Sequence, residues 1–370
     1  MKKIIKDEVI NLLGKIPLAK NLARKKFISA FLLALLDSKK VQFQDIALHI
    51  DSEAKLESVE RNIQSFFKDY EFDYQQVCLL LVLFLPRGKL NLSIDRTEWD
   101  FGTYQCNILM IVARCETAAI PLYWEMLDNK SGNSNCQDRC ILLDKLIKVI
   151  GKERIGLIVG DREFIGIGWV KYLKINTIPF CMRVPKNHLI TLKNGDFYSI
   201  AELLITEKER YFEDCMVDGI VCNCMLKILP GNEFLFLIGH MPAKQLGGHY
   251  RKRWCIEVLF QSFKERGFDL ESTHLKCNKK LSKLLVFVSI AVALCVKVGM
   301  YFHKKVQSIK TKKHGYKANS FFRTGLNIVR RSLKNAKHNF AQLWQDCIVT
   351  FSRWVEMQLA YNQKFTEIFG

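Results

Sequence analysis

The segment IGLIVGD at residues 155–161 decides the fold class of this 370-residue chain. Its continuous apolar run is typical of a buried β-strand, and the run ends on an acid, Asp161. Upstream, LNLSID at residues 90–95 alternates apolar and polar residues, as a half-buried strand does, and also ends on an acid, Asp95. In open α/β sheets, functional groups collect beyond the carboxyl ends of strands. An acid in front of a helix can equally be an N-cap, so Asp161 has two interpretations at this point.

The segments around these two strands favour an α/β sheet of mixed direction. Two more apolar strands separate the acids, then a helix, and a further helix and strand follow Asp161. Residues 185–245 depart from this rhythm, because short β-like runs joined by turns such as Asp218-Gly219 predict a β-rich insertion. The predicted strands are 107–113, 119–124, 155–161, 179–184, 211–217, 220–229 and 234–238, and the predicted helices are 136–150 and 163–174.

The N-terminal residues 1–85 are predicted to be helical. Short helices at 43–50 and 56–67, after an apolar helix at 27–36, are compatible with a helix-turn-helix. In the helix at 56–67, Arg61 and Asn62 fall on the polar face and are candidates for contact with a DNA groove. Helix pairs of this kind also occur in proteins that bind nothing, so this pattern alone decides nothing.

Charge points to a polyanionic partner. The formal net charge is +19 and the isoelectric point is near 9.3, and nucleic acid is the commonest partner of such proteins. The charge is uneven, since residues 301–340 contain eleven Lys or Arg and no acid. A solvated basic face is the simpler reading, but forty residues without an acid fit a phosphate backbone better.

Thirteen cysteines do not form a disulfide framework in this sequence. The N-terminus lacks the features of a signal peptide, and most of the cysteines lie inside apolar runs, so we expect a reducing cytoplasm. No pair of cysteines has the spacing and histidine partners of a zinc site. The apolar stretch 284–296 is too short to span a bilayer and is predicted to be a buried core helix, so no membrane partner is expected.

A third acid stands in the segment YRKRWCIEVLFQSFK at residues 250–264. On one continuous helix, Tyr250, Arg253, Glu257 and Lys264 would share a narrow arc beside a separate apolar stripe. An ordinary amphipathic helix with an ion pair between Arg253 and Glu257 would look the same.

Phosphodiester chemistry would use all three acids in the same way, as ligands of divalent metal ions. Two divalent ions activate the attacking hydroxyl or water and stabilise the leaving oxygen in such reactions. Mg²⁺ prefers a few carboxylates together with substrate phosphate oxygens. Asp95, Asp161 and Glu257 would supply such ligands if the fold brought them together, which the sequence alone does not show.

The spacing Tyr250-x2-Arg253-x3-Glu257-x6-Lys264 resembles the YREK signature of bacterial insertion-sequence transposases, the type-4 branch of the DDE superfamily. Residues 92–97 and 159–164 resemble that family's first and second aspartate strands, and the β-rich insertion lies where the family has one. The resemblance covers residues 90–275 most strongly. It implies an RNase H-like core in which Asp95, Asp161 and Glu257 are catalytic and bind two Mg²⁺ or Mn²⁺ ions. It also implies that Tyr250, Arg253 and Lys264 contact DNA phosphates.

Related enzymes cut the element's end through a DNA hairpin, which requires an extruded base held by aromatic stacking. This sequence has no Trp between Trp169 and Trp254, so the hairpin route is in doubt. Phe234 or Phe236 are possible substitutes. Trp254 either stacks on DNA or packs in the core, and packing is slightly favoured.

Arg162 and Glu163 are further candidates beside Asp161. Arg162 is placed with the DNA-binding residues, together with Tyr250, Arg253 and Lys264. Surface or capping roles fit Arg162 and Glu163 equally well.

These observations predict a DNA transposase that cuts at transposon ends and joins them to target DNA by cut-and-paste transposition. Its expected partners are the element's terminal inverted repeats, target DNA and a second copy of the chain on DNA, in a bacterial cytoplasm at the nucleoid. The alternatives are an inactive DNA-binding repressor or inhibitor of transposition, and a nuclease without strand transfer. The predicted domains are a helical DNA-binding domain at 1–85, the RNase H-like core at 86–184 and 246–300, the β-rich insertion at 185–245, and a basic helical C-terminal region at 301–370.

Overall fold

The computed structural model combines N-terminal helices, one large mixed sheet and C-terminal helices, which confirms the predicted α/β class. The structure describes residues 2–15, 18–101, 104–128, 132–200, 202–204, 208–231, 233–264, 266–313, 315–334, 342–343 and 345–357. Residues 335–341, which belong to the predicted basic C-terminal region, lie outside the described residues.

Helices occupy the chain up to residue 83, as predicted. The side chain of Asn21 caps α2 by accepting a hydrogen bond from the Arg24 backbone N–H, and Asp73 caps α5. Helix α3 ends at Ala47 instead of Ile50, so its connection to α4 is longer than the short turn of a helix-turn-helix. The helices are α1 (Lys2–Gly14), α2 (Leu22–Ser38), α3 (Phe43–Ala47), α4 (Leu56–Asp69) and α5 (Tyr74–Leu83).

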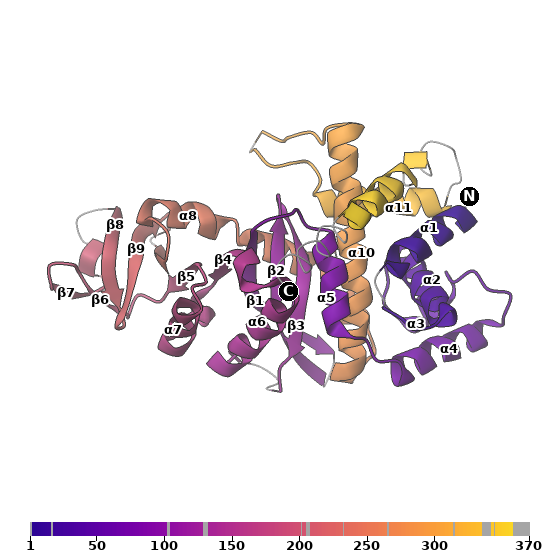
Figure 1. Cartoon of the computed structure of the whole chain (residues 1–370), viewed down its shortest axis with the longest axis horizontal. Coiled ribbons are helices and arrows are strands. Elements are labelled where there is room, and N and C mark those ends of the chain that lie inside the picture. Colours follow the sequence, from indigo (N-terminus) through magenta and orange to yellow (C-terminus); the bar gives the residue numbers. More distant parts are fainter. Residues whose placement is uncertain are drawn as a thin grey trace.

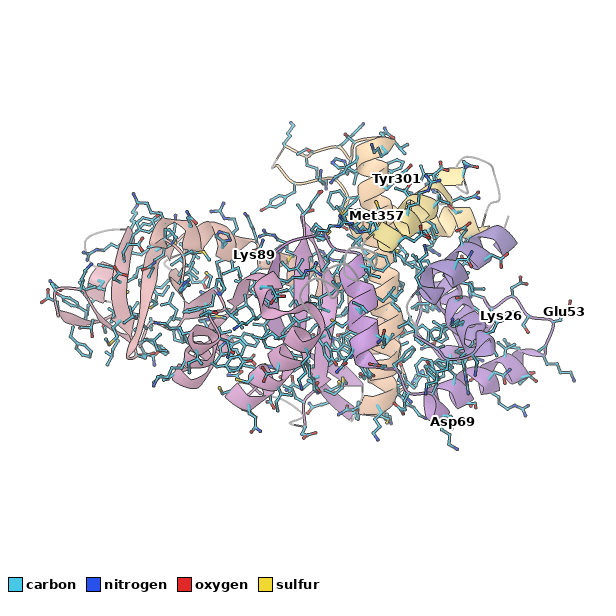
Figure 2. The ribbon with its side chains drawn as sticks, in the orientation of Figure 1. Lys26, Glu53, Asp69, Lys89, Tyr301 and Met357 are labelled. Carbon is cyan, nitrogen blue, oxygen red and sulfur yellow. The ribbon has the colours of Figure 1, made fainter. Side chains whose placement is uncertain are left out.

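Helix α4 has one buried and one exposed face, because its apolar residues recur at helical spacing. Arg61 and Asn62 are exposed, as predicted. Figure 2 shows Glu53, from the connection before α4, at the outer end of this helical region. The buried side chains of α4 are Val59, Ile63, Phe66 and Phe67.

The core sheet has the strand order β3-β2-β1-β4-β5. Strand β2 is antiparallel to β1 and β3, whereas β1, β4 and β5 are parallel. This order and these directions are those expected of an RNase H-like core. The strands are β1 (Leu90–Phe101), β2 (Tyr104–Cys115), β3 (Ala118–Met126), β4 (Ile155–Gly160) and β5 (Phe180–Val184).

Two helices connect the parallel strands. Helix α6 (Cys136–Ile150) begins at the predicted residue, because Asn135 and Asp138 form a reciprocal capping box. Helix α7 (Ile167–Ile175) starts later than the predicted residue 163. A 3₁₀ turn at Arg162–Phe164 comes first, and Gly166, at a φ of 149°, interrupts the helical path.

The β-rich insertion continues the core sheet. Its last strand, β10, pairs antiparallel with β5, and the order β10-β9-β8-β6-β7 follows. Asp218 and Gly219 both have positive φ angles, as a tight two-residue hairpin turn between β8 and β9 requires. The strands are β6 (Leu189–Thr191), β7 (Phe197–Ser199), β8 (Glu209–Val217), β9 (Ile220–Leu229) and β10 (Glu233–Gly239).

The long helix α10 (Asn278–Lys305) is a core helix. It packs on β3, α2 and α5, and it contains the predicted apolar stretch 284–296. By length and composition it is the one helix in the described part of the chain that could cross a membrane, but 83% of its most apolar window is buried inside the protein. This burial favours the predicted role in the core.

Helix α11 (Phe321–Lys334) packs very closely on α10. A Cβ atom on Gly299 would lie 1.9 Å from the Phe321 carbonyl oxygen, and one on Gly325 would lie 1.8 Å from the Cys295 carbonyl oxygen. Glycine at these two positions therefore allows the two backbones to touch. Further on, the described residues 345–357 are helical, and the Phe351 ring stacks on that of Phe84, with 4.3 Å between their centroids.

Figure 1 shows an elongated arrangement. The insertion strands lie at one end, the core sheet in the middle, and helices α1–α4 at the other end, with α10 standing between the core sheet and these helices. The remaining helices, α8 (Ala243–Arg251) and α9 (Trp254–Phe263), return the chain from the insertion to the core.

Candidate active site

Two of the predicted acids lie side by side because of strand register. The parallel pairing of β1 with β4 ends at Ser93 and Val159. Asp95 and Asp161 each follow two residues later, so both stand just beyond the end of the pairing. The prediction that Asp95 ends its strand is wrong, since β1 continues to Phe101 as the antiparallel partner of β2.

The third acid, Glu257, comes from α9, which packs on β1 and β3. The sequence predicted one continuous helix over residues 250–264, but the structure has two helices there. Helix α8 ends at Arg251, and short-range hydrogen bonds lead into α9, such as that from the Arg253 N–H to the Tyr250 carbonyl at 2.9 Å. This tight turn sets the directions of Tyr250, Arg253 and Glu257.

All three acids converge on the guanidinium of Arg253. Its Nη1 lies 2.7 Å from Asp95 Oδ2, and its Nη2 lies 3.6 Å from Asp161 Oδ2 and also donates to Glu257 Oε1. The Arg253 side chain is largely buried. One cation therefore stands among three carboxylates, which leaves excess negative charge whenever all three are ionised.

Tyr250 closes the cluster on one side. Its hydroxyl donates a hydrogen bond to Asp161 Oδ1 at 3.0 Å, and the Arg253 guanidinium lies 5.5 Å from the centre of its ring. Tyr250 therefore contacts Asp161 directly, and Arg253 contacts both Asp161 and Asp95.

Burial and charge act in opposite directions on these groups. Burial raises the pKa of Asp95 to about 6, although Arg253 opposes it. Burial also acts to raise the pKa of Asp161, but Arg253, the Arg162 N–H and the Tyr250 hydroxyl outweigh it and the pKa is lowered. Burial raises the pKa of Tyr250 to about 12. The pKa of Arg253 is raised, because the Tyr250 and carboxylate charges outweigh its burial. Arg253 therefore stays charged.

Sequence reasoning missed Arg183, which extends the site towards the insertion. Its Nη2 donates to Glu233 Oε1 at 2.6 Å and to the Phe234 carbonyl at 3.1 Å. It also interacts with Tyr250. The sequence feature that could have identified Arg183 is its position as the single charged residue in the apolar strand FCMRV at residues 180–184.

Glu163 belongs to a separate, structural network beside the acids. It accepts hydrogen bonds from the Ser134 N–H and hydroxyl, both at 2.8 Å, and from Arg96 Nε at 3.0 Å. Arg139 in turn donates to the Ser134 hydroxyl at 2.9 Å. Arg162, which precedes Glu163, is exposed to solvent.

Other predicted residues lie away from the three acids. Lys264 directly follows α9 and forms an ion pair with Glu271 at 2.7 Å. Trp254 is 58% exposed, which contradicts the expectation that it packs in the core. Arg61 and Asn62 lie on α4 in the N-terminal helical region.

The two phenylalanines suggested for base stacking are poorly placed for it. Phe236 is buried, and Phe234 is only half-buried and stacks on Phe236, with 5.6 Å between their ring centroids. The buried position of Phe236 follows from its place in β10, between β5 and β9. Phe236 is therefore not available to a base.

The donor set of the three acids fits a hard divalent cation. Carboxylate oxygens are the ligands that Mg²⁺ and Mn²⁺ prefer, and this cluster already surrounds one cationic group. Among the described residues, no three acidic, His or Cys side chains stand close enough together to hold an ion, because here the acids surround the Arg253 guanidinium. An ion would thus have to take the place of that guanidinium.

Comparison with known structures gives distant similarities. The piggyBac transposase synaptic complex with hairpin DNA has 12% identity over 94% of this chain and 82% of that chain, with a TM-score of 0.45. Endonuclease V from Bacillus subtilis has 13% identity over 54% of this chain and 84% of its own, with a TM-score of 0.27. The C-terminal lobe of a budding yeast Argonaute has 10% identity over 72% of this chain and 60% of its own, with a TM-score of 0.21. Scores this low carry no argument about residue roles.

No curated protein matches this sequence. Residues 92–294, more than half of the chain, match the family described as transposase DDE domain. The match includes all three acids and spans the core, the insertion and most of α10. The chain therefore belongs to the transposase DDE domain family.

Proposed function

We propose that this protein is a metal-dependent DNA transposase that cuts at the ends of its element and joins them to target DNA. The convergence of Asp95, Asp161 and Glu257 on one buried cation carries the proposal. Carboxylates from three separate elements would not be gathered at one edge of a sheet for stability alone, since uncompensated buried charge is costly. The YREK spacing supports the insertion-sequence branch.

In this proposal Asp95, Asp161 and Glu257 hold two Mg²⁺ or Mn²⁺ ions. When bound, such ions supply the activation of the attacking oxygen and the stabilisation of the leaving oxygen in phosphoryl transfer. Asp95 contributes a carboxylate whose pKa of about 6 leaves it ionised above neutral pH. The hydrogen bond from Tyr250 holds one Asp161 oxygen in place.

The cationic residues would serve the phosphate group. Arg253 already lies at the carboxylates and carries five N–H donors, so its guanidinium can bind a phosphate oxygen when ions neutralise the acids. Tyr250 and Lys264 are proposed to make further phosphate contacts, which position the strand and offset its charge. Arg162 is exposed next to Asp161 and can extend these contacts.

The remaining surfaces complete the proposed DNA complex. Exposed Arg61 and Asn62 on α4 are candidates for reading the terminal inverted repeat. The basic residues after α10 are candidates for backbone contacts, here or on target DNA. Cutting two ends in one complex favours a homodimer on DNA, and the bacterial cytoplasm at the nucleoid is the proposed compartment.

The test is cleavage of DNA that carries the element's terminal repeat, with Mg²⁺, by the wild-type protein and by Asp161→Ala. We expect cleavage at the repeat boundary by the wild type only, and none by either protein in EDTA. Specific binding without cleavage, equal in both proteins, would leave the repressor as the function. Cleavage without joining of the 3′ ends to target DNA would leave a simple nuclease, and the end structure would show whether a hairpin forms.

A further inference from the structure

Three cysteines gather on one face of the hairpin β8–β9, in the insertion at one end of the molecule (Figure 1). Cys215 on β8 stands directly opposite Cys222 on β9. Cys224 is two residues further along β9, so it points to the same face of the sheet. All three are free thiols, and their side chains are buried, with exposures of 1%, 6% and 0%. The register of one hairpin therefore places three thiols side by side, outside the candidate active site.

The Cys215 side chain is in contact with both of its neighbours. Its sulfur forms hydrogen bonds with the thiols of Cys222 and Cys224. In its neutral form it also donates to the Cys222 carbonyl oxygen at 3.2 Å. The two thiol donors lower the pKa of Cys215, although burial opposes them. The hydrogen bond to Cys215 and burial raise the pKa of Cys222. Cys215 is therefore the thiol of this group that loses its proton first, and a thiolate is the nucleophilic form of cysteine.

Cys222 is better placed than Cys224 to form a disulfide with Cys215. Residues directly opposite each other in an antiparallel pair have Cα atoms about 4.5–5.5 Å apart, within the range of about 4.4–6.8 Å that a disulfide spans. Diagonal neighbours are about 7–8 Å apart, which is beyond that range. A bulge interrupts the pairing of β8 between Phe212 and Cys215, and Asp214 within it has a φ of 52°. Because the residues of a bulge lie outside the regular pairing, β8 can adjust there when the bond forms.

A pocket beside the hairpin gives access to Cys215. Its volume is about 310 Å³, and its wall includes Cys215, Tyr211 and the turn at 192–194. This volume is at the lower end of the range of small-molecule sites. At the turn, the Lys193 ammonium lies 3.5 Å from Asp214, and the Lys193 side chain is 79% exposed. Solvent screens such a pair, so the turn is held only weakly. A small molecule can therefore reach Cys215 without unfolding of the hairpin.

We propose that Cys215 and Cys222 are a redox-active pair, which a small-molecule disulfide such as oxidised glutathione converts to a disulfide between β8 and β9. The Cys215 thiolate attacks one sulfur of the small disulfide, whose S–S bond breaks, and a first small thiolate leaves. Cys222 then attacks the Cys215 sulfur and displaces a second small thiolate. The protons of the two protein thiols end on the two small thiols. The protein thiols are thus oxidised and the small disulfide is reduced, and an excess of small thiol reverses the reaction.

Oxidation of the folded, full-length protein by oxidised glutathione tests the inference. After the remaining free thiols are alkylated, a protease that cuts before aspartate separates Cys215 from Cys222, because Asp214 and Asp218 precede them. We expect a linked pair of peptides whose mass is lower than the sum of the two by two hydrogen atoms, and dithiothreitol should separate the pair. Cys295 is the internal control. It is buried in α10 and burial raises the pKa of its thiol, so it should stay reduced.

Two matched variants distinguish Cys222 from Cys224. Cys222→Ser should abolish the linked peptides, whereas Cys224→Ser, the same change two residues away, should retain them. Circular dichroism shows whether each variant is folded, and the mapping of the wild-type protein needs no variant. Linkage of Cys215 in Cys222→Ser to the wild-type extent would overturn the proposal. So would a linkage that forms only after unfolding in urea, or a mixed disulfide that persists at Cys215. Neither DNA nor metal enters this experiment, so its outcome is independent of the cleavage assay.

Discussion

Two arginine–carboxylate clusters lie beside each other in the core, and they differ in how their charges are matched. In the cluster around Glu163, the cations Arg96 and Arg139 face the acids Glu163 and Glu98. Ser134 supplies two further donors to Glu163. The charges balance, and the acceptors of Glu163 are satisfied.

In the cluster around Arg253, a single cation serves Asp95, Asp161 and Glu257. Both clusters arise from the same strand ends, since Arg96 follows Asp95 and Glu163 stands two residues after Asp161. A balanced buried network is what stability selects, whereas an excess of buried anions is costly without added cations. We infer from this difference that the first cluster is structural and that the second serves the proposed chemistry, and the substitutions in the two clusters test that inference.

The largest effect is expected for Glu257→Gln. The amide keeps the shape of the side chain but removes a charge that is proposed to bind the metal, so cleavage should fall about a thousandfold, in line with several kcal/mol of transition-state stabilisation. Thermal stability should not fall, because the cluster loses an excess anion. Rates from a cleavage assay and melting curves check both statements. Cleavage at the wild-type rate would contradict the role of the second cluster.

The opposite pattern is expected for Glu163→Ala. The Glu163 side chain is 14% exposed and holds Arg96 and Ser134 together, so its loss should lower the free energy of unfolding by about 2–4 kcal/mol. Residual cleavage by the folded fraction should remain. Denaturant unfolding measures the change. Glu98→Gln is the control, because Glu98 is the more exposed acid of the network and its loss should cost less than about 1 kcal/mol.

The sequence predicted the strands and the identity of the acids better than their surroundings. Asp161 follows an uninterrupted apolar strand, and local periodicity is enough to find it. The pairing of Asp95 with Asp161 depends on the register of β1 and β4, which is a property of two distant segments. No local pattern contains that information.

The turn between α8 and α9 shows a second limit. A helical pattern across residues 250–264 predicted one continuous helix, but the chain tightens at Lys252 and Arg253, and two helices, α8 and α9, meet there. The break lies where α9 begins to pack on β3, a contact between distant segments that the local pattern does not contain. The exposure of Trp254 has a simpler cause, because at about 100° per residue it stands on the opposite side of α9 from the buried residues Ile256 and Phe263.

A smaller effect is expected for Asp95→Asn. Burial raises the pKa of Asp95 from 3.8 to about 6, so the folded protein binds an extra proton between these pH values and the charged carboxylate destabilises it above pH 6. The neutral amide should therefore stabilise the metal-free protein by up to about 3 kcal/mol at pH 7.5, from a shift of about two units worth about 1.4 kcal/mol each. The gain should disappear as the pH falls towards 4. Melting curves at several pH values test this, and a gain that grows at low pH would contradict it.

The smallest effect is expected at the edge of α9, where Lys264 and Glu271 form a charge pair that is about one-third exposed at each side chain. Solvent screens such a pair, so Lys264→Gln should change the free energy of unfolding by less than about 1 kcal/mol. If Lys264 also contacts a phosphate, the variant should make the salt dependence of duplex binding shallower by about 0.9 in log–log slope. Anisotropy at several salt concentrations measures this slope. An unchanged slope would mean that Lys264 only forms a surface ion pair. Arg253, the cation shared by all three acids, would then be the residue of this segment that contacts phosphate.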